Sequence, residues 1–131
     1  MIALLAFCCV SQAFGQKREH RAVWMSAYVA DWPSGAITSG NADAMKQICR
    51  NNLDSLQRNN FTTIYYHVRA MCDAMYDSKY EPWSSYASGT RGVAPAFDPF
   101  AFLMEEAHKR GIEVYAWLNP YRYQNSAYNE G

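Results

Sequence analysis

Charged side chains follow two stretches of this sequence that are typical of β-strands. Asp31 comes shortly after the first stretch, and Arg69 and Asp73 come at the end of the second. A carboxylate can orient a hydroxyl group or a catalytic acid, and the planar fork of an arginine can hold a carboxylate in place. An aspartate in such a loop also commonly caps a turn or pairs with an arginine. Both interpretations stay open for Asp31 and Asp73.

Other polar side chains occupy comparable positions. His67 lies two residues before Arg69 on the same side of the strand, where it is either a proton donor or a hydrogen-bonded core residue. Asn119 and Arg122 follow a third strand-like stretch, in the motif LNPYR. The residues suited to chemistry therefore gather where strands end.

Three stretches have the β-branched and aromatic content and the two-residue alternation of β-strands. Each combines an aliphatic-leaning face with a polar-aromatic face, as in the third, where Glu113, Tyr115 and Trp117 alternate with Val114 and Ala116. The three predicted strands span residues 21–29, 61–69 and 112–118.

Two amphipathic helices are predicted between these strands. The first spans residues 41–59, where apolar residues recur at three- and four-residue spacing. The second begins with Asp98 as N-cap and Pro99 in its first turn, and it stops at Gly111. The connection over residues 70–97 has no helical period, and structureless loops of that length usually serve a function.

This order of elements predicts an α/β fold in which consecutive strands are parallel neighbours. No GxGxxG or Walker glycine pattern follows any strand, which disfavours a nucleotide-binding doubly wound sheet. The polar-aromatic faces suit the inside of a closed (β/α)8 TIM barrel, which needs about 250 residues. We therefore expect residues 16–131 to form the N-terminal βαβαβ portion of such a barrel, incomplete in this chain.

The amino-acid composition narrows the class of molecule that the chain is expected to bind. Twelve basic residues balance twelve acidic ones, so the chain lacks the electrostatic footprint of a nucleic-acid-binding protein. Cys49 and Cys72 form neither a CxxC motif nor a zinc spacing. We expect two free or buried thiols rather than a disulfide, and no metal or cofactor.

The first 15 residues, MIALLAFCCVSQAFG, resemble a secretory signal peptide with a cleavage site after Gly15. The usual basic residues at the start are missing, so either the true start lies upstream or the signal is atypical. The alternative is a buried first strand or helix. A signal peptide predicts a secreted, periplasmic or envelope-associated protein with no integral membrane segment after cleavage.

Three blocks of sequence carry a family resemblance: HRAVWMSAYVADWPS, HVRAMCDAMYDSKYEPWSSY and FDPFAFLMEEAHKRGIEVYAWLNPYR. Together, over residues 20–122, they resemble the N-terminal part of the bacterial glycosyl hydrolase-like family that is similar to family 10 glycosidases. The resemblance implies a (β/α)8 barrel that cleaves glycosidic bonds, with bacterial cell-wall glycan as a candidate substrate. The family tends to carry Gln in place of His67 and Pro in place of Ala70, which leaves the shape of the second loop open.

Glycoside hydrolysis usually needs two carboxyl groups flanking the bond. The resemblance implies that these acids lie on later strands, beyond residue 131, so the catalytic residues are unknown here. Aromatic side chains suit stacking on pyranose rings and are equally good core fillers. We expect Trp117 to be core, and the predicted substrate-binding residues are Asp31, Trp32, His67, Arg69, Asp73, Tyr76, Trp83, Asn119, Tyr121 and Arg122.

Two functions of different classes are consistent with the sequence. The first is part of a secreted glycosidase acting on a polysaccharide or oligosaccharide, inactive by itself without the later acids. The second is a non-catalytic carbohydrate-binding or envelope interaction domain that keeps the aromatic surface of the barrel without its acids.

Overall fold

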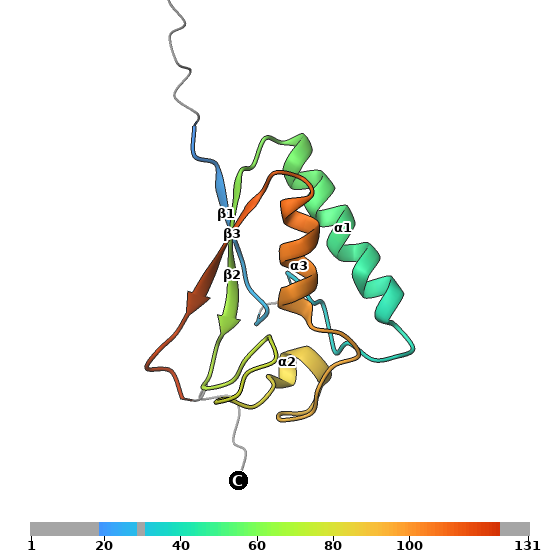
Figure 1. Ribbon diagram of the computed structural model, residues 1–131, viewed down its shortest axis with the longest axis vertical. Coiled ribbons are helices and arrows are strands. Elements are labelled where there is room, and N and C mark those ends of the chain that lie inside the picture. Colours follow the sequence, from blue (N-terminus) through green and yellow to red (C-terminus); the bar gives the residue numbers. More distant parts are fainter. Residues whose placement is uncertain (1–18, 29–30, 124–131) are drawn as a thin grey trace, which may run out of the picture.

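The computed structural model describes residues 19–28 and 31–123, which form a three-stranded parallel sheet covered by helices on one face (Figure 1). The strands are β1 (Ala22–Met25), β2 (Thr63–Arg69) and β3 (Glu113–Leu118), and they lie in the order of the sequence. The predicted α/β fold with parallel neighbouring strands is confirmed. Closure into a barrel remains a prediction.

Helices α1 (Ala42–Arg58) and α3 (Pro99–His108) cross from one strand to the next and pack on the same face of the sheet (Figure 1). Both agree with the predicted ranges. Asp98 caps α3 by accepting a hydrogen bond from the backbone N–H of Ala101 at 2.9 Å, as its position before Pro99 indicates. Gly111 ends this segment with a φ of 70°, a conformation that favours glycine.

The first strand is shorter than predicted, because it ends at Met25 rather than at residue 29. The carboxylate of Asp31 accepts a hydrogen bond from the backbone N–H of Ser26 at 2.8 Å, and the N–H of Asp31 donates to the carbonyl of Ser26 at 3.3 Å. These two bonds close a turn between Ser26 and Asp31, and the strand ends before this turn.

The core lies between the sheet and the two long helices. Ile64 and Tyr66 on β2 are fully buried there, together with Leu53 of α1 and Leu103 of α3. These residues come from the aliphatic face of the predicted strand and the apolar stripes of the predicted helices. The alternation in the sequence therefore assigned the covered face of the sheet correctly.

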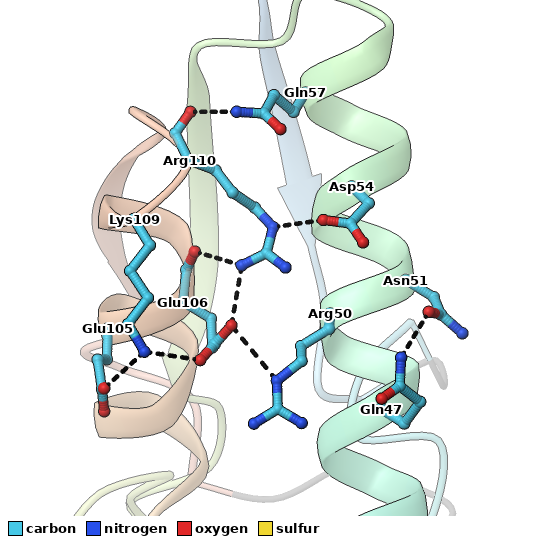
Figure 2. A network of polar contacts seen from close by, with 9 residues as sticks. All are labelled: Gln47, Arg50, Asn51, Asp54, Gln57, Glu105, Glu106, Lys109 and Arg110. Carbon is cyan, nitrogen blue, oxygen red and sulfur yellow. Dashed lines mark hydrogen bonds and ion pairs between the residues drawn. The ribbon is translucent and has the colours of Figure 1, made fainter.

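A polar network on the outside of this core joins α1 to α3 (Figure 2). Arg110 Nε pairs with Asp54 Oδ1 at 2.6 Å, and Arg110 Nη1 pairs with Glu106 Oε2 at 2.9 Å. Arg50 and Lys109 also reach the Glu106 carboxylate, at 3.4 and 2.9 Å. Hydrogen bonds from Arg110 and then Lys109 lower the pKa of Glu106 to about 2, against the opposing effect of its burial.

The long connection after β2 contains a single helical turn, α2 (Ser85–Ser88), capped by the hydroxyl of Ser84. Four residues are too few to show a helical period, which is why the sequence did not reveal this turn. An isolated bridge between Ala74 and Trp83 folds the connection back on itself. The connection is thus an ordered loop at the carboxyl end of the sheet (Figure 1).

Two further expectations concern the termini and the cysteines. The predicted signal peptide lies outside the described residues. Within residues 19–28 and 31–123, no helix is long and apolar enough to cross a bilayer. Cys49 and Cys72 are both free, as predicted, and burial raises the pKa of the Cys49 thiol to about 12.

Candidate functional site

The carboxyl ends of parallel strands meet at one edge of a sheet, so the segments after β1, β2 and β3 come together there. In Figure 1 the arrows of β2 and β3 point to this edge, beside α2 and the loop that holds it. All of the residues predicted to bind substrate belong to these strand ends or to the segments that follow them. Their individual environments, however, differ sharply.

Asn119 is the best-anchored residue at this edge. Its side-chain Oδ1 accepts a hydrogen bond from Trp117 Nε1 at 3.0 Å, and its Nδ2 lies 2.9 Å from His67 Nε2. Its backbone N–H donates to the carbonyl of Arg69 at 3.0 Å, and its carbonyl accepts from Arg69 Nη1 at 2.7 Å. Residues about fifty positions apart in the sequence therefore meet at one point.

His67 is buried, with 2% of its surface exposed, and its ring stacks on that of Trp117 at a centroid distance of 3.9 Å. Burial lowers the pKa of His67; the nearby Asp73 acts in the opposite direction, and Arg122 lowers the pKa further. The ring is therefore neutral at neutral pH. Of the two interpretations from the sequence, this environment favours the hydrogen-bonded residue over the proton donor.

Arg69, at the end of β2, connects the loop to the segment that follows β3. Its Nε donates to Glu81 Oε1 at 2.6 Å, its Nη1 to the Asn119 carbonyl, and its Nη2 to the sulfur of Cys72 at 3.2 Å. The side chains of Arg69 and Glu81 are only 15% and 22% exposed. The arginine thus holds a carboxylate through its planar fork, but that carboxylate belongs to the protein's own loop.

Asp73 and Asp31 both cap turns. Asp73 is 3% exposed, and its Oδ1 accepts hydrogen bonds from the backbone N–H groups of Ala70 and Met71 at 3.2 and 2.8 Å. Asp31 binds the N–H of Ser26 in the same way. For Asp73 the prediction of direct substrate contact is wrong in this structure, because the carboxylate is enclosed by the turn that it stabilises.

The four aromatic residues predicted to bind substrate occupy three kinds of position. Trp32 is fully buried on the helix side of the sheet, and its Nε1 donates to the Met45 carbonyl at 3.0 Å, so its prediction as a stacking surface is wrong. Tyr76 and Trp83 are partly buried and pack against the core. Tyr121 is 97% exposed, and its neighbour Arg122 is exposed as well.

Aromatic side chains also cover the face of the sheet opposite the helices. Trp24 stacks on Tyr65 at 4.9 Å and meets Trp117 edge-on at 4.9 Å, while Tyr65 lies 5.5 Å from Tyr115. Trp24 is 60% exposed and Tyr115 is 49% exposed. We call these four residues the aromatic face. Only the alternation along the strands indicated this face, and none of its four members was among the predicted site residues. Trp117, which we expected to be core, lies on this face and is only partly buried, because its side chain points away from the helices.

A second feature missed by the sequence is a hollow of about 280 Å³ beside the carboxyl end of β1. Tyr28 and Tyr86 form part of its lining, with ring centroids 5.3 Å apart and their planes inclined at 67°. Ser34 and Ser85 contribute polar side chains. No spacing signal connects these residues, because they come from three separate segments.

Comparison of the chain with known proteins identifies its family. The family model described as glycosyl hydrolase-like 10 matches residues 19–130. The chain belongs to the glycosyl hydrolase-like 10 family. It is 42% identical over 106 residues to the glycosyl hydrolase YngK of Bacillus subtilis (strain 168), covering 80% of this chain and 20% of that protein. It is 37% identical over 108 residues to the glycosyl hydrolase DigH of Escherichia coli (strain K12), covering 78% of this chain and 25% of that protein.

The family resemblance found in the sequence is therefore confirmed. This glycosyl hydrolase-like 10 chain spans about a fifth to a quarter of the length of the curated relatives that it matches. The aligned region includes the carboxyl ends of its strands, where the hydrogen bonds around Asn119 are found. The match shows a glycosyl hydrolase-like region in this chain.

Three acids at the carboxyl edge of this family member already have structural partners in the described part of the chain. Asp31 and Asp73 bind backbone N–H groups, and Glu81 pairs with Arg69. Among the described residues, no group of three or more His, Cys, Asp or Glu side chains is arranged to hold a metal ion. The described edge is therefore suited to positioning and hydrogen bonding rather than to supplying a free carboxylate pair.

Proposed function

We propose that this chain forms the first three strands of a (β/α)8 barrel in a secreted or envelope-associated glycoside hydrolase. In this proposal the chain supplies part of the substrate-binding wall. The two carboxyl groups that break the glycosidic bond come from residues outside those described, since Asp31, Asp73 and Glu81 all have structural partners.

The observation that supports the proposal best is the position of the aromatic face. Closing a sheet of this kind turns one face inward, and the helices already cover the other. Trp24 and Tyr115 then line the lumen, and Asn119 stands at the carboxyl end, where barrels of this type build their sites. Tyr121 and Arg122 extend the wall into the following loop.

The proposed substrate is a polysaccharide, with bacterial cell-wall glycan as the first candidate. A pyranose ring has an apolar face and a polar rim, so it matches aromatic side chains beside amide and hydroxyl groups. Two of the matched relatives are named glycosyl hydrolases, and both are bacterial. The neutral charge balance of the chain fits a substrate that is not recognised chiefly by charge.

A second function is a carbohydrate-binding domain without catalysis. It is favoured by one observation: three acids at the carboxyl edge, Asp31, Asp73 and Glu81, are used to cap turns or to pair with Arg69. Such a domain would keep the aromatic residues that bind carbohydrate but lack the carboxyl groups that cleave it. The two functions share a ligand and differ only in whether the bond is broken.

The experiment is to incubate the intact protein with purified peptidoglycan and to measure both sedimentation with the glycan and release of new reducing ends. Binding with release supports the hydrolase, and binding without release supports the carbohydrate-binding domain. If the protein neither binds nor cleaves peptidoglycan or a panel of other bacterial polysaccharides, both proposals fail.

A pair of exposed variants localises the interaction. Tyr121→Ala removes an aromatic ring that is 97% exposed at the carboxyl edge, and we expect it to weaken glycan binding about threefold to tenfold. Ile48→Ala removes a partly exposed apolar side chain from α1, on the helix side, and should leave binding unchanged. Equal binding by both variants would argue against the carboxyl edge as the binding surface.

A further inference from the structure

The side chain of Asn119 is held by two neighbours of different chemistry, Trp117 and His67. We propose that Trp117 and His67 lock the Asn119 amide in one orientation, so that Asn119 presents one N–H donor and one carbonyl lone pair to adjacent hydroxyl groups of a sugar. In this arrangement Asn119 is the contact, and Trp117 and His67 are positioning residues. The sugar contact rests on the proposed function, whereas the locked orientation does not.

The orientation follows from the inventory of donors and acceptors. An indole N–H can only donate, so the Asn119 atom 3.0 Å from Trp117 Nε1 has to be the oxygen Oδ1. The amide nitrogen Nδ2 then faces His67 Nε2 at 2.9 Å and donates to it. An acceptor ring nitrogen carries no proton, so the proton of the neutral His67 ring is on Nδ1, a buried atom without a hydrogen-bond partner among the described residues.

Two alternative arrangements are each disfavoured at one contact. Turning the amide by 180° would place its N–H₂ group against the Trp117 N–H, leaving two donors facing each other. A protonated Nε2 on His67 would likewise face the Asn119 N–H₂ group. His67 is 2% exposed, so water cannot readily replace the lost bond. Trp117 therefore fixes the orientation of the Asn119 amide, and that amide fixes the tautomer of His67.

The Asn119 main chain is fixed as firmly as its side chain. The backbone carbonyl of Arg69 accepts from the N–H of Asn119 at 3.0 Å, and Arg69 Nη1 donates to the Asn119 carbonyl at 2.7 Å. Glu81 Oε1 holds the arginine in turn by accepting from its Nε at 2.6 Å. A ligand that meets a side chain already held in place loses less freedom on binding. Anchoring of both backbone and side chain is what a preorganised contact requires.

Half of the hydrogen-bonding capacity of the amide is left over. An asparagine amide has two N–H donors and two acceptor lone pairs, and Trp117 and His67 use one of each. Within the described part of the chain, the remaining donor and lone pair of Asn119 have no partner. The residue is partly exposed at the carboxyl end of β3. A donor and an acceptor side by side match neighbouring sugar hydroxyls, each of which can both donate and accept.

A purely structural role at the end of β3 makes a different prediction. If the role is purely structural, variants of Trp117, His67 and Asn119 should change the stability of the protein but not its binding or cleavage of glycan. The two roles are therefore separated by measuring the histidine tautomer, the kinetic constants and the thermal unfolding of the same variants.

The tautomer is measured on the intact protein by two-bond ¹H–¹⁵N correlation of its histidine rings at pH 8. We expect His67 to be protonated on Nδ1, with Nε2 unprotonated. In Trp117→Phe, which keeps an aromatic ring but removes the N–H, the Asn119 amide is released and the tautomers should mix. Protonation of His67 on Nε2 in the wild-type protein would overturn the locked orientation.

The sugar contact is measured with soluble glycan chains of alternating N-acetylglucosamine and N-acetylmuramic acid as the probe. Trp117→Phe and Asn119→Asp should each raise KM about threefold to tenfold and leave kcat within about twofold, as expected for a contact made equally in the ground and transition states. His67→Gln, whose Oε1 can still accept from Asn119, should stay within about twofold of wild type. Asn51→Asp on α1 makes the same chemical change away from the edge and should be neutral.

The outcomes are separable. Unchanged KM in both Trp117→Phe and Asn119→Asp, in a protein that cleaves the probe, would overturn the sugar contact while the proposed function stands. If the wild-type protein binds the probe without cleaving it, the same variants are compared by their Kd for the probe instead of their KM. A wild-type protein that neither binds nor cleaves any glycan refutes the proposed function and the sugar contact together, whereas the tautomer still decides the orientation.

Discussion

Replacing Glu106 with Gln should destabilise the protein at neutral pH and have almost no effect near pH 2. The Glu106 side chain is 8% exposed and faces three cations, of which Arg110 is the most buried at 14%. Glutamine keeps the shape of the side chain but removes its charge. Arg110 would retain Asp54 and the backbone carbonyl of Glu106, so the network is weakened rather than abolished.

The size of the effect follows from the pKa of Glu106, which falls from an ordinary value of 4.5 to about 2 in the folded protein. At 1.36 kcal/mol per pH unit this amounts to about 3 kcal/mol. Because Arg50 and Lys109 are 38% and 54% exposed, solvent screening reduces the expected contribution to about 1–2 kcal/mol. The folded pKa is depressed, so this stability is present above pH 4.5 and is lost as the pH falls towards 2.

The assay is denaturant or thermal unfolding of wild type and Glu106→Gln at several pH values between 7 and 2. The difference in unfolding free energy should be about 1–2 kcal/mol at pH 7 and should shrink towards zero in acid, where the wild-type carboxyl is protonated as well. Glu105→Gln is the matched control, since Glu105 is 65% exposed and, among the described residues, pairs with Lys109 alone. We expect that control to stay within about 0.5 kcal/mol. A Glu106→Gln penalty that is the same at pH 7 and pH 2 would refute this reasoning.

Three further predictions follow from burial and contacts. Arg69→Lys cannot reach Glu81, Asn119 and Cys72 at once as the guanidinium does, so proteolysis within residues 70–97 should become faster, and an unchanged cleavage rate would count against its role in anchoring the loop. Trp32→Ala should cost about 3–5 kcal/mol in unfolding free energy, whereas Tyr121→Ala should stay within about 0.5 kcal/mol; similar values for both would contradict the core position of Trp32. Mass spectrometry after iodoacetamide treatment at pH 8 should show Cys72 alkylated long before Cys49, since Cys49 is buried and its pKa is raised to about 12.

Much of the fold was predictable because its signals are local. The period of two along β2 and β3 separated the covered face from the aromatic face, and Asp98-Pro99 marked the start of α3. The end of β1 was less predictable, because it depends on a turn in which Asp31 takes the backbone groups of Ser26. A local pattern cannot show whether a backbone group will be used by a sheet or by a side chain.

The candidate site was predictable in location but not in roles. Arg69, His67 and Asn119 were all singled out, and they meet at one edge because parallel strands end together. Whether each one faces a ligand or another residue depends on neighbours about fifty positions away. That is why Arg69 proved to hold Glu81, and why Asp73 proved to cap its own turn.

By itself, the sequence determined the order of strands and helices, the parallel sheet and the glycosyl hydrolase-like family, since each is written in short-range periodicity or in contiguous motifs. Only the tertiary structure decided which tryptophan is core and which is exposed. Trp32 and Trp24 belong to the same segment of sequence, yet the first is fully buried against the helices and the second is 60% exposed on the opposite face. Burial is a property of the packed layers, and it arises only when α1 and α3 close over one side of the sheet.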